Sequence, residues 1–599
     1  MKYSIQQQSV IESDGNMVVN AVAGSGKTTT LGGYALARKS KSILYLAFNS
    51  SVRKEAQAKF AQMGLRNVRV ETAHSLALGA FRSKKFSIYQ GSYQPYDVKR
   101  ILGFQKKDAI ADMKFGSHVL KVTSLFCNST ASKVSEIDYL NHLKNPEERS
   151  FAQNVYDDLI HQSRKFLNMM KTGEIDMTHD FYLKLYQLRQ PKLSGFEYIL
   201  FDEAQDASPV MLDVFLNQPA VKVIVGDEHQ QIYSWRHAVN ALKSSDFDRK
   251  ELNTSYRFNQ EIADLAKSVL RTKNHMEELT VPNLKGVGGD EAERPVRATL
   301  GRTNGGILVD VIGQLIDDKT VSSVYFEGHF NSYTYADEGG SVYDVLNLYQ
   351  GEFKRIRNPM IRQFNDFQEL QEYTDQSGDA PMKGIIDIVM KYGKELPRMI
   401  NCIKENHVDH EQKETADMIY STVHKAKGME YDQVTLLDDF LGEEKMIDLL
   451  ERPDINPDPD RLLEDTNILY VGLTRTKSKL RLPASLIPAD FEVEGRKSVE
   501  AILPVFNLSE VPLNEIGESK KEIKPNKAST SGKTYSYDEV RKSKPSAYSP
   551  WSQEEDLELE DLFMQRMAIK EMAEHFGRTR GAISSRIKKL QLREKHFDA

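Results

Sequence analysis

Residues 20–30 read NAVAGSGKTTT, a glycine-rich turn that follows the apolar residues MVV. Small residues in such a turn let backbone N–H groups approach a polyphosphate, and a helix beginning near Lys27 adds its positive end. Lys27 would reach the outer phosphates and Thr28 would hold Mg²⁺. The strict pattern has glycine where this chain has Ala21, but the glycines of the tight part of the turn remain. The segment predicts a phosphate-binding loop formed by Ala23, Gly24, Ser25, Gly26, Lys27, Thr28 and Thr29.

A second turn with candidate catalytic side chains, FDEAQDASP, occupies residues 201–209 at the end of an apolar run. Adjacent carboxylates after a strand suit the hydrolysis of a magnesium nucleotide, because Asp202 would position the metal and Glu203 would take a proton from the attacking water. Acidic pairs after strands are also common as solvated loop ends. Combined with the phosphate-binding loop, the pair predicts hydrolysis of ATP with Mg²⁺ as cofactor.

The composition of the 599 residues is that of an ordinary soluble protein, 40% hydrophobic and 28% charged, with room for about three to five domains. No apolar run approaches the roughly 20 residues that span a bilayer, and the N-terminus MKYSIQQQSV has no signal-like core. Only Cys127 and Cys402 are present, which argues against a disulfide framework. A net charge of -6 argues against a basic coat but allows a local basic groove. We therefore expect no membrane partner and a cytoplasmic or nucleoid-associated protein, nuclear in a eukaryote and not secreted.

Short apolar runs that end at polar turns recur along the chain and are typical of buried parallel strands in an α/β fold. They are MVVNAVAG, SILYLAFN, FEYILFDE, VKVIVGDE, MIYSTVH and DQVTLLDD. Two groups of runs imply two sheet domains, at 1–80 with 181–275 and at 276–317 with 406–507. Two stretches, 81–180 and 318–405, differ in sequence pattern from these groups, and we expect them to form inserted, mostly helical subdomains.

The C-terminal region has a different character. Residues 508–548 are polar, lysine-rich and interrupted by proline and glycine, which predicts a flexible linker. In residues 549–599, apolar side chains recur at helical spacing in three blocks, with Gly577 to end the second and Thr579 to cap the third. The first block is acidic and the third is basic. We expect a small all-α domain of three helices.

The motifs resemble, in order and residue type, the superfamily 1 helicases of the UvrD type over roughly residues 3–485. The resemblance implies two RecA-like motor domains that hold ATP between them. YSIQQQSVI resembles the motif that reads adenine through Gln7, and VGDEHQQIYSWRHA resembles the motif in which Gln230 senses the γ-phosphate. NTSYRFNQEI would supply Tyr256 to stack on the adenine and Arg257 to touch the γ-phosphate.

Two later motifs complete the nucleotide site that the resemblance implies. STVHKAKGMEYDQV would join strand contacts to the nucleotide through His424, Gly428 and Glu430, and YVGLTRTKSKL offers Arg475 as a second arginine finger. Arginine contacts stabilise charge on the transferring phosphoryl group, so hydrolysis would require the motor domains to close. The implied catalytic residues are Lys27, Glu203, Gln230, Arg257 and Arg475.

The same resemblance implies a single-strand grip. A grip that ignores sequence relies on backbone charge and on base stacking, for which Trp235 is the best candidate. The alternative for Trp235 is a buried core position, and for Phe48, His74 and His424 a structural role. The implied strand contacts are Phe48, Asn49, His74, Tyr233, Trp235, Arg236 and His424.

Two finer resemblances concern the branch and the tail. TVHKAKGMEYDQVTLLDDF and ILYVGLTRTKSKL are most similar to the F-box DNA helicase branch, but the glutamine motif begins almost at the first residue, so we expect no F-box and no ubiquitin-ligase role. The tail resembles the Myb/SANT-like helix-turn-helix group, whose third helix enters the major groove. The alternative is a charged solvated face or a protein-docking module. The side chains implied to face duplex DNA include Arg578, Arg580, Arg586 and Lys589.

Two other activities are not expected. KGIIDIV at 383–389 resembles a fragment of RecB-type nucleases, but no matching D-x-K segment follows. The histidines show no metalloprotease spacing, and two distant cysteines do not make a zinc site.

The resemblance implies an ATP-dependent DNA helicase and 3′–5′ single-strand translocase in repair, recombination or replication, acting on single-stranded DNA and single/double-strand junctions. The likeness to the F-box branch keeps a second hypothesis open, a remodeller that strips proteins such as recombinase filaments from DNA with little unwinding. A DNA-binding regulator with a degenerate ATPase is disfavoured, because every expected catalytic residue type is present. The tail would tether the motor to duplex DNA or to a protein partner.

Overall fold

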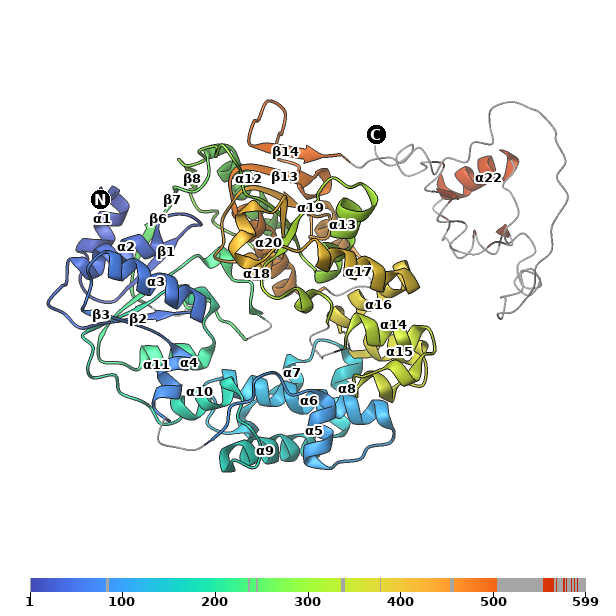
Figure 1. Ribbon diagram of the computed structural model, residues 1–599, viewed down its shortest axis with the longest axis horizontal. Coiled ribbons are helices and arrows are strands. Elements are labelled where there is room, and N and C mark those ends of the chain that lie inside the picture. The colour runs from blue at the N-terminus through green and yellow to red at the C-terminus, as the bar shows by residue number, and fades with distance from the viewer. Residues whose placement is uncertain are drawn as a thin grey trace. The chain divides into compact units, whose positions relative to one another are not determined.

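The computed structural model describes residues 2–503, except 82–85, 235–236, 244–245, 336–339, 378 and 453–456. In the tail it describes α22 (Gln553–Met564) and scattered residues between 567 and 590. The chain divides into two units, Met1–Phe506 and Asn507–Ala599 (Figure 1). The segment expected to be a flexible linker, 508–548, lies outside the described residues.

The first sheet of the larger unit confirms the α/β expectation. Its order is β3-β2-β4-β5-β1-β6, and each neighbouring pair is parallel. Parallel strands end at a common edge, so the turns after β1, β4 and β5 come together there. The strands are β1 (Met17–Ala21), β2 (Ile43–Ala47), β3 (Val68–Thr72), β4 (Tyr198–Phe201), β5 (Val221–Gly226) and β6 (Asp248–Leu252).

Helices cover both faces of this sheet, which explains why its strands are apolar throughout. One face packs against α2 (Lys27–Leu36) and α3 (Ser50–Gln62), and the other against α11 (Pro209–Leu216). The N-terminal α1 (Ile5–Glu12) packs on α2 and starts with a capping box between Ser4 and Gln7. The first sheet is therefore a buried layer between helices.

The segment between β3 and β4 is helical and has its own apolar core, which includes Phe115, Phe166 and Phe181. After α4 (Ala73–Gly79), its helices are α5 (Pro95–Leu102), α6 (Ala109–Asn128), α7 (Tyr139–His142), α8 (Pro146–Asn154), α9 (Tyr156–Thr172) and α10 (His179–Gln187).

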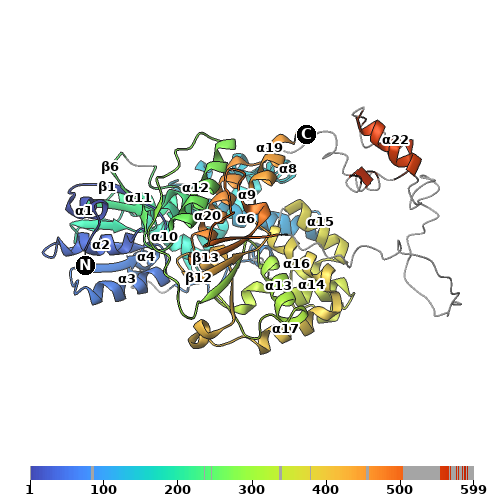
Figure 2. The ribbon, with the colours of Figure 1, turned by 90° about the horizontal axis from the view of Figure 1, so that it is seen from above.

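The second sheet is also parallel throughout, with the order β10-β11-β9-β12-β13-β14. Figure 2 shows α20 (Pro459–Leu473) beside β12 and β13, while α13 (Asn304–Ile312) packs against β9 and β11. Its strands are β9 (Arg297–Gly301), β10 (Val324–Phe326), β11 (Met418–Thr422), β12 (Tyr431–Leu436), β13 (Thr476–Pro483) and β14 (Val499–Ile502).

Two elements cross the boundaries expected from the sequence. β10 falls within 318–405, the range expected for the second insertion, yet it pairs with β11 and so belongs to the second sheet. α12 (Gln260–Arg271) falls within the range expected for the first domain, but its apolar face shares the core of α20 and the second sheet. A short pair, β7 (Thr254–Ser255) with β8 (Lys285–Gly286), flanks α12.

The second insertion shares one apolar cluster with α13 and the edge of the second sheet. Met113 of α6 joins this cluster, and α15 lies against α8, so the two insertions touch (Figure 1). Among the described helices, none has the length and apolar character needed to cross a bilayer. The helices of this insertion are α14 (Val342–Tyr349), α15 (Phe367–Ser377), α16 (Ala380–Tyr392) and α17 (Leu396–Glu405).

The described part of the tail corrects one expectation. Leu559 of α22 packs with Met572, Phe576, Ile583 and Ile587, the inward-facing positions that the spacing predicts. Arg578 is 2% exposed, and its guanidinium donates to both carboxylate oxygens of Glu555 at 3.1 and 3.0 Å. The expectation that Arg578 faces DNA is wrong, because the first helix neutralises it inside the small domain. Trp551, Arg580 and Lys589 lie outside the described residues, and the role of Arg586 in a helix-turn-helix stays a prediction.

Candidate nucleotide site and nucleic-acid groove

The predicted phosphate-binding loop connects β1 to α2. Gly24 and Gly26 have φ of +71° and +79°, which glycine adopts without strain. Gly26 caps α2, whose first residue is Lys27, so the unpaired N–H groups of its first turn lie at the loop. The Ser25 hydroxyl is buried without a hydrogen-bond partner among the described residues. These features fit a polyphosphate, which would accept hydrogen bonds from the loop and the Ser25 hydroxyl.

The loop is packed tightly against two segments far away in the sequence. The Tyr256 N–H donates to the Gly24 carbonyl at 2.9 Å, and the Gln7 amide donates to the Ser25 carbonyl at 3.3 Å. A Cβ on Gly24 would stand 2.6 Å from the Arg257 Cβ. Tyr256 itself is 48% exposed, which leaves its ring accessible for stacking. The structure therefore brings Gln7, Tyr256 and Arg257 to one loop.

The acidic pair follows β4 at the same edge. Glu203 has φ of +52°, a strained value for a residue other than glycine, and its carboxylate lies 3.7 Å from the Lys27 amine. Burial opposes ionisation of Glu203, but Lys27 and Lys427 outweigh it and lower its pKa. Burial and the neighbouring Glu203 raise the pKa of buried Asp202.

The surroundings of Asp202 fit a divalent cation. The Tyr45 hydroxyl donates to its carboxylate and also interacts with the Thr28 hydroxyl, so the predicted metal ligands share one neighbour. A buried carboxylate with a raised pKa gains from a nearby positive charge. Asp202 and Thr28 would hold Mg²⁺. Thr29 is placed differently, since its hydroxyl accepts a hydrogen bond from Lys59 at 2.9 Å.

Two arginines close the site where the motor domains meet. Arg475, 2% exposed, donates to the Gln230 side-chain oxygen at 3.3 Å and to the Val471 carbonyl at 3.1 Å. Burial and the nearby Arg257 lower the pKa of Arg475. Arg257 pairs with Glu430 at 2.6 Å and donates to the Thr474 carbonyl at 2.7 Å. All the predicted catalytic side chains thus belong to a single network that joins the two sheets.

Several members of this network were not singled out from the sequence. The Gln230 amide donates to Asp227 at 2.6 Å, and the Tyr470 hydroxyl of α20 donates to the same carboxylate at 3.2 Å. Lys273, just after α12, donates to Asn467 of α20 at 2.6 Å, and its amine lies 3.5 Å from the His229 ring of the first domain. Asp227 and Tyr470 lie in the quoted segments VGDEHQQIYSWRHA and YVGLTRTKSKL, but the sequence assigned neither a role. Lys273 lies in no quoted motif, and its role depends on tertiary contacts alone.

A groove of about 820 Å³ runs between the first motor domain and its helical insertion. Phe48, Asn49 and His74, three of the predicted strand contacts, line it. The Phe48 ring stacks on Tyr233 with a centroid distance of 5.5 Å and an interplanar angle of 21°. The groove therefore has an aromatic pair beside it, the kind of platform on which bases stack.

Several of the predicted strand contacts also have partners within the protein. The Asn49 side chain accepts from the Val52 N–H and caps α3, while His74 lies 3.5 Å from Asp180. His424 contacts the Ile232 carbonyl at 3.1 Å. Trp235 and Arg236 lie outside the described residues.

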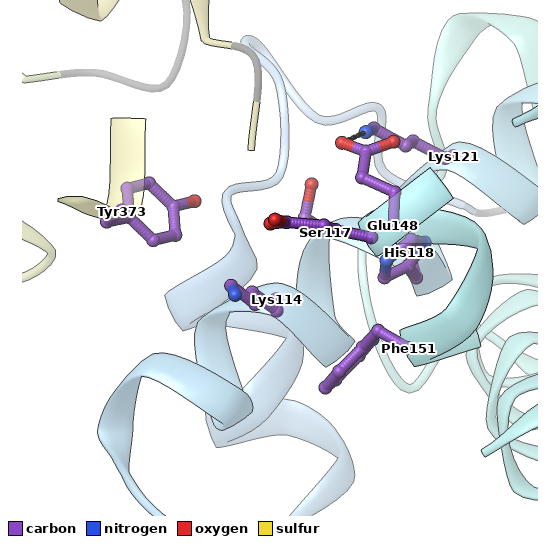
Figure 3. Close-up of a pocket in the computed structure, with 8 residues that line it drawn as sticks. Lys114, Ser117, His118, Lys121, Glu148, Phe151 and Tyr373 are labelled. Atoms are coloured by element: carbon purple, nitrogen blue, oxygen red, sulfur yellow. Dashed lines mark hydrogen bonds and ion pairs between the residues drawn. The ribbon is translucent and has the colours of Figure 1, made fainter. Parts of the chain in front are cut away.

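A second, much smaller pocket lies between the two insertions (Figure 3). Its volume is about 20 Å³, room for a water molecule and too little for a nucleotide. His118 and Phe151 line one side, Tyr373 of α15 the other, and Lys121 pairs with Glu148 at 2.8 Å (Figure 3). Burial lowers the pKa of His118 to about 3, so this pocket holds a neutral imidazole.

Comparison with known families agrees with this geometry. The family model described as UvrD/REP helicase N-terminal domain matches residues 3–249. The model described as UvrD-like helicase C-terminal domain matches residues 137–485, more than half of the chain. The chain belongs to the UvrD-like helicase family. The N-terminal match ends before α12, the helix that packs with the second sheet.

Named relatives of this UvrD-like chain include two F-box DNA helicases. F-box DNA helicase 1 of Gallus gallus is 29% identical over 528 residues, covering 81% of this chain and 49% of that protein. F-box DNA helicase protein 1 of Schizosaccharomyces pombe is 27% identical over 524 residues, covering 80% and 57%. ATP-dependent DNA helicase PcrA of Bacillus subtilis is 26% identical over 305 residues, covering 45% and 39%. The chain thus spans about half the length of the curated relatives it matches.

Proposed function

We propose that the chain is an ATP-dependent DNA helicase that moves 3′ to 5′ along single-stranded DNA. The observation that carries the proposal is the composite site, in which Arg475 of the second motor domain contacts Gln230 of the first at 3.3 Å. Such a site is complete only when the two sheets are close together. Relatives named as ATP-dependent DNA helicases support the same activity.

In this proposal each group at the site has a defined task. The loop and Lys27 bind the β- and γ-phosphates of ATP, while Glu203, ionised at neutral pH, orients the attacking water. Mg²⁺, when bound by Thr28 and Asp202, would neutralise phosphate charge. Arg257 and Arg475 stabilise the charge that develops on the transferring phosphoryl group. Because these arginines depend on domain contacts, hydrolysis is tied to closure, and closure moves the second motor domain relative to the groove.

The test is ATP hydrolysis with and without single-stranded DNA. Lys27→Ala and Glu203→Gln are expected to lower DNA-stimulated turnover by about 100-fold or more. The matched controls are Lys39→Ala, beyond the far end of α2, and Glu197→Gln, just before β4, which should retain it. Hydrolysis by the pure protein that ignores DNA would contradict the proposed coupling.

The direction of movement, and the choice between unwinding duplex DNA and displacing proteins, need a separate assay. Substrates with a 3′ or a 5′ single-stranded tail distinguish the direction of movement, and unwinding only from the 3′ tail is expected. A second candidate, left open by the resemblance to the F-box DNA helicase branch, is a remodeller that removes proteins from DNA. Displacement of a bound protein without separation of a bare duplex would select it.

We also propose that the chain acts in DNA repair, recombination or replication, on the basis of its similarity to DNA helicases. A tether role for the tail, toward duplex DNA or a protein partner, is also proposed. Deletion of residues 545–599 should then lower DNA affinity or partner recruitment and leave single-strand-stimulated hydrolysis intact.

A further inference from the structure

Lys59, near the end of α3, directs its ammonium at the first turn of α2. The ammonium donates to the Thr29 hydroxyl at 2.9 Å, and both side chains are half-buried. Among the described residues, the Lys59 ammonium has no carboxylate partner. Lys59 does not belong to the residues that the motifs predict to bind the nucleotide, so its position at this loop needs its own explanation.

Close packing of α3 against α2 holds the ammonium in this position (Figure 2). A Cβ on Gly32 of α2 would stand 2.7 Å from the Met63 sulfur and 3.6 Å from the Phe60 ring. Phe60 is 2% exposed, and its ring packs edge-on against Tyr45 of β2 with a centroid distance of 5.0 Å. The end of α3 is therefore fixed against both the sheet and α2, and Lys59 is held beside the start of α2.

This placement is electrostatically unfavourable without an anion. The N-terminal end of a helix is positive, and cations are better placed at its C-terminal end. Lys59 lies in the last turn of its own helix, yet its ammonium bonds at the first turn of α2, where Lys27 adds a second positive charge. In the same loop, the buried Ser25 hydroxyl has no partner among the described residues. Both features indicate an anionic ligand at this loop.

The neighbours of the loop indicate which phosphate the ammonium would reach. The Lys27 amine lies 3.7 Å from the Glu203 carboxylate, at the end of the site where the γ-phosphate is expected. A Cβ on Gly26 would stand 3.0 Å from the Gln7 amide nitrogen and 3.9 Å from the Thr29 Cβ. Thr29 thus lies on the side of Gln7, the residue expected to read the adenine. The phosphate of ATP nearest to the adenosine is the α-phosphate.

We infer that Lys59 is a nucleotide-binding residue that contacts the α-phosphate of ATP, and this inference rests on the proposed function. The Thr29 N–H belongs to the first turn of α2, and the hydroxyl of the same residue holds the ammonium beside it. A phosphate oxygen that accepts from this N–H also accepts from Lys59, because an ammonium has donors beyond the one that Thr29 accepts. Lys27 and Lys59 bind opposite ends of the triphosphate. Because the α-phosphate is common to ATP and ADP and none of its bonds breaks, Lys59 contributes to affinity and not to turnover.

The experiment measures nucleotide binding by the full-length chain, in competition with a fluorescent ADP analogue, and steady-state ATP hydrolysis on oligothymidylate. In Lys59→Met, which keeps the apolar stem of the lysine, the Kd of ADP and the KM of ATP should both rise by about tenfold, as expected for the loss of one charge-assisted hydrogen bond. The kcat at saturating ATP and the Kd of adenosine, which has no phosphate, should stay unchanged. The matched control is Lys54→Met, which removes an exposed ammonium from the same helix and should keep every wild-type value.

Three results would overturn the inference. An unchanged Kd of ADP in Lys59→Met removes the contact with the α-phosphate. A Kd of adenosine that rises as much as the Kd of ADP would assign the ammonium to the base or the sugar. A weaker ADP affinity accompanied by a lower kcat and a lower melting temperature would show a merely structural contact. If the wild-type protein itself binds no ADP, the proposed function fails first, so the two failures are distinguishable.

Discussion

Replacing Gly24 by alanine should separate catalysis from stability at the phosphate-binding loop. The new Cβ would stand 2.6 Å from the Arg257 Cβ and from the Ser255 hydroxyl, where ordinary contact begins near 3.4 Å. The loop and the Arg257 segment must therefore move apart by about 0.8 Å. The left-handed φ of +71° adds about 1–2 kcal/mol of backbone strain.

The displacement acts on the residue expected to touch the γ-phosphate. A misplacement of about 1 Å at a catalytic group costs about 100-fold in rate, so DNA-stimulated kcat in Gly24→Ala should fall by about that factor. Stability should fall by only about 1–2 kcal/mol, the strain term. The assay pairs steady-state ATP hydrolysis with thermal melting of the same preparation.

Gly15→Ala is the matched control. Gly15 also has a positive φ, +87°, but nothing lies within 4 Å of its Cβ position. It should therefore lose similar stability and keep its kcat. If Gly24→Ala keeps wild-type kcat, or if both variants lose kcat in proportion to stability, the close approach of Arg257 to the loop has no catalytic importance.

Three more predictions address the groove, the domain boundary and the tail. Phe48→Ala should weaken single-strand binding by about 1–3 kcal/mol in a fluorescence titration. The control is Tyr349→Ala, which removes an exposed ring on α14 and should leave the affinity unchanged. If Phe48→Ala binds as tightly as the wild type, Phe48 does not stack on bases. Burial lowers the pKa of Lys273 from 10.5 to about 8, so between pH 8 and 10.5 the unfolded state binds more protons than the folded state, and stability should rise with pH. Thermal melts at pH 8 and 10 should show this rise in the wild type and not in Lys273→Met. An equal rise in both proteins would contradict the lowered pKa of Lys273. Arg578→Ala should destabilise the small domain by about 1–3 kcal/mol, because it leaves the Glu555 carboxylate without its partner. The loss should appear as faster amide exchange in α22 of the full-length chain. Unchanged exchange would mean that the pair of Arg578 with Glu555 contributes little to stability.

Local patterns were sufficient for the α/β fold class and for the nucleotide loop. The apolar runs at β1, β2, β4, β5, β11 and β12 all form strands, because each is buried on both faces and ends at a polar turn. The loop was readable since Gly24, Gly26 and Lys27 act through local backbone geometry. The family resemblance pointed to Arg257 and Arg475, which lie more than 200 residues apart; in the structure Arg475 contacts Gln230 and Arg257 pairs with Glu430, and their catalytic roles stay predictions.

Tertiary contacts decided what local patterns could not. β10 is only three residues long, Val324–Phe326, and becomes a strand because β11 lies beside it. Lys427 reads as one basic residue among several until the fold places Asp206 against it. Arg578 lies in a basic run typical of DNA contact, but its environment is fixed by Glu555, 23 residues earlier in the chain.

The position of α12 determines where this chain can be cut. Ile262, Leu265 and Val269 are at most 1% exposed and lie in the core of the second sheet, although α12 precedes every strand of that sheet. A first half that ended at residue 275 would carry this apolar face into water and should aggregate. A second half that began there would lack part of its core. A division just before α12, near residue 258, keeps this apolar face with the sheet that buries it.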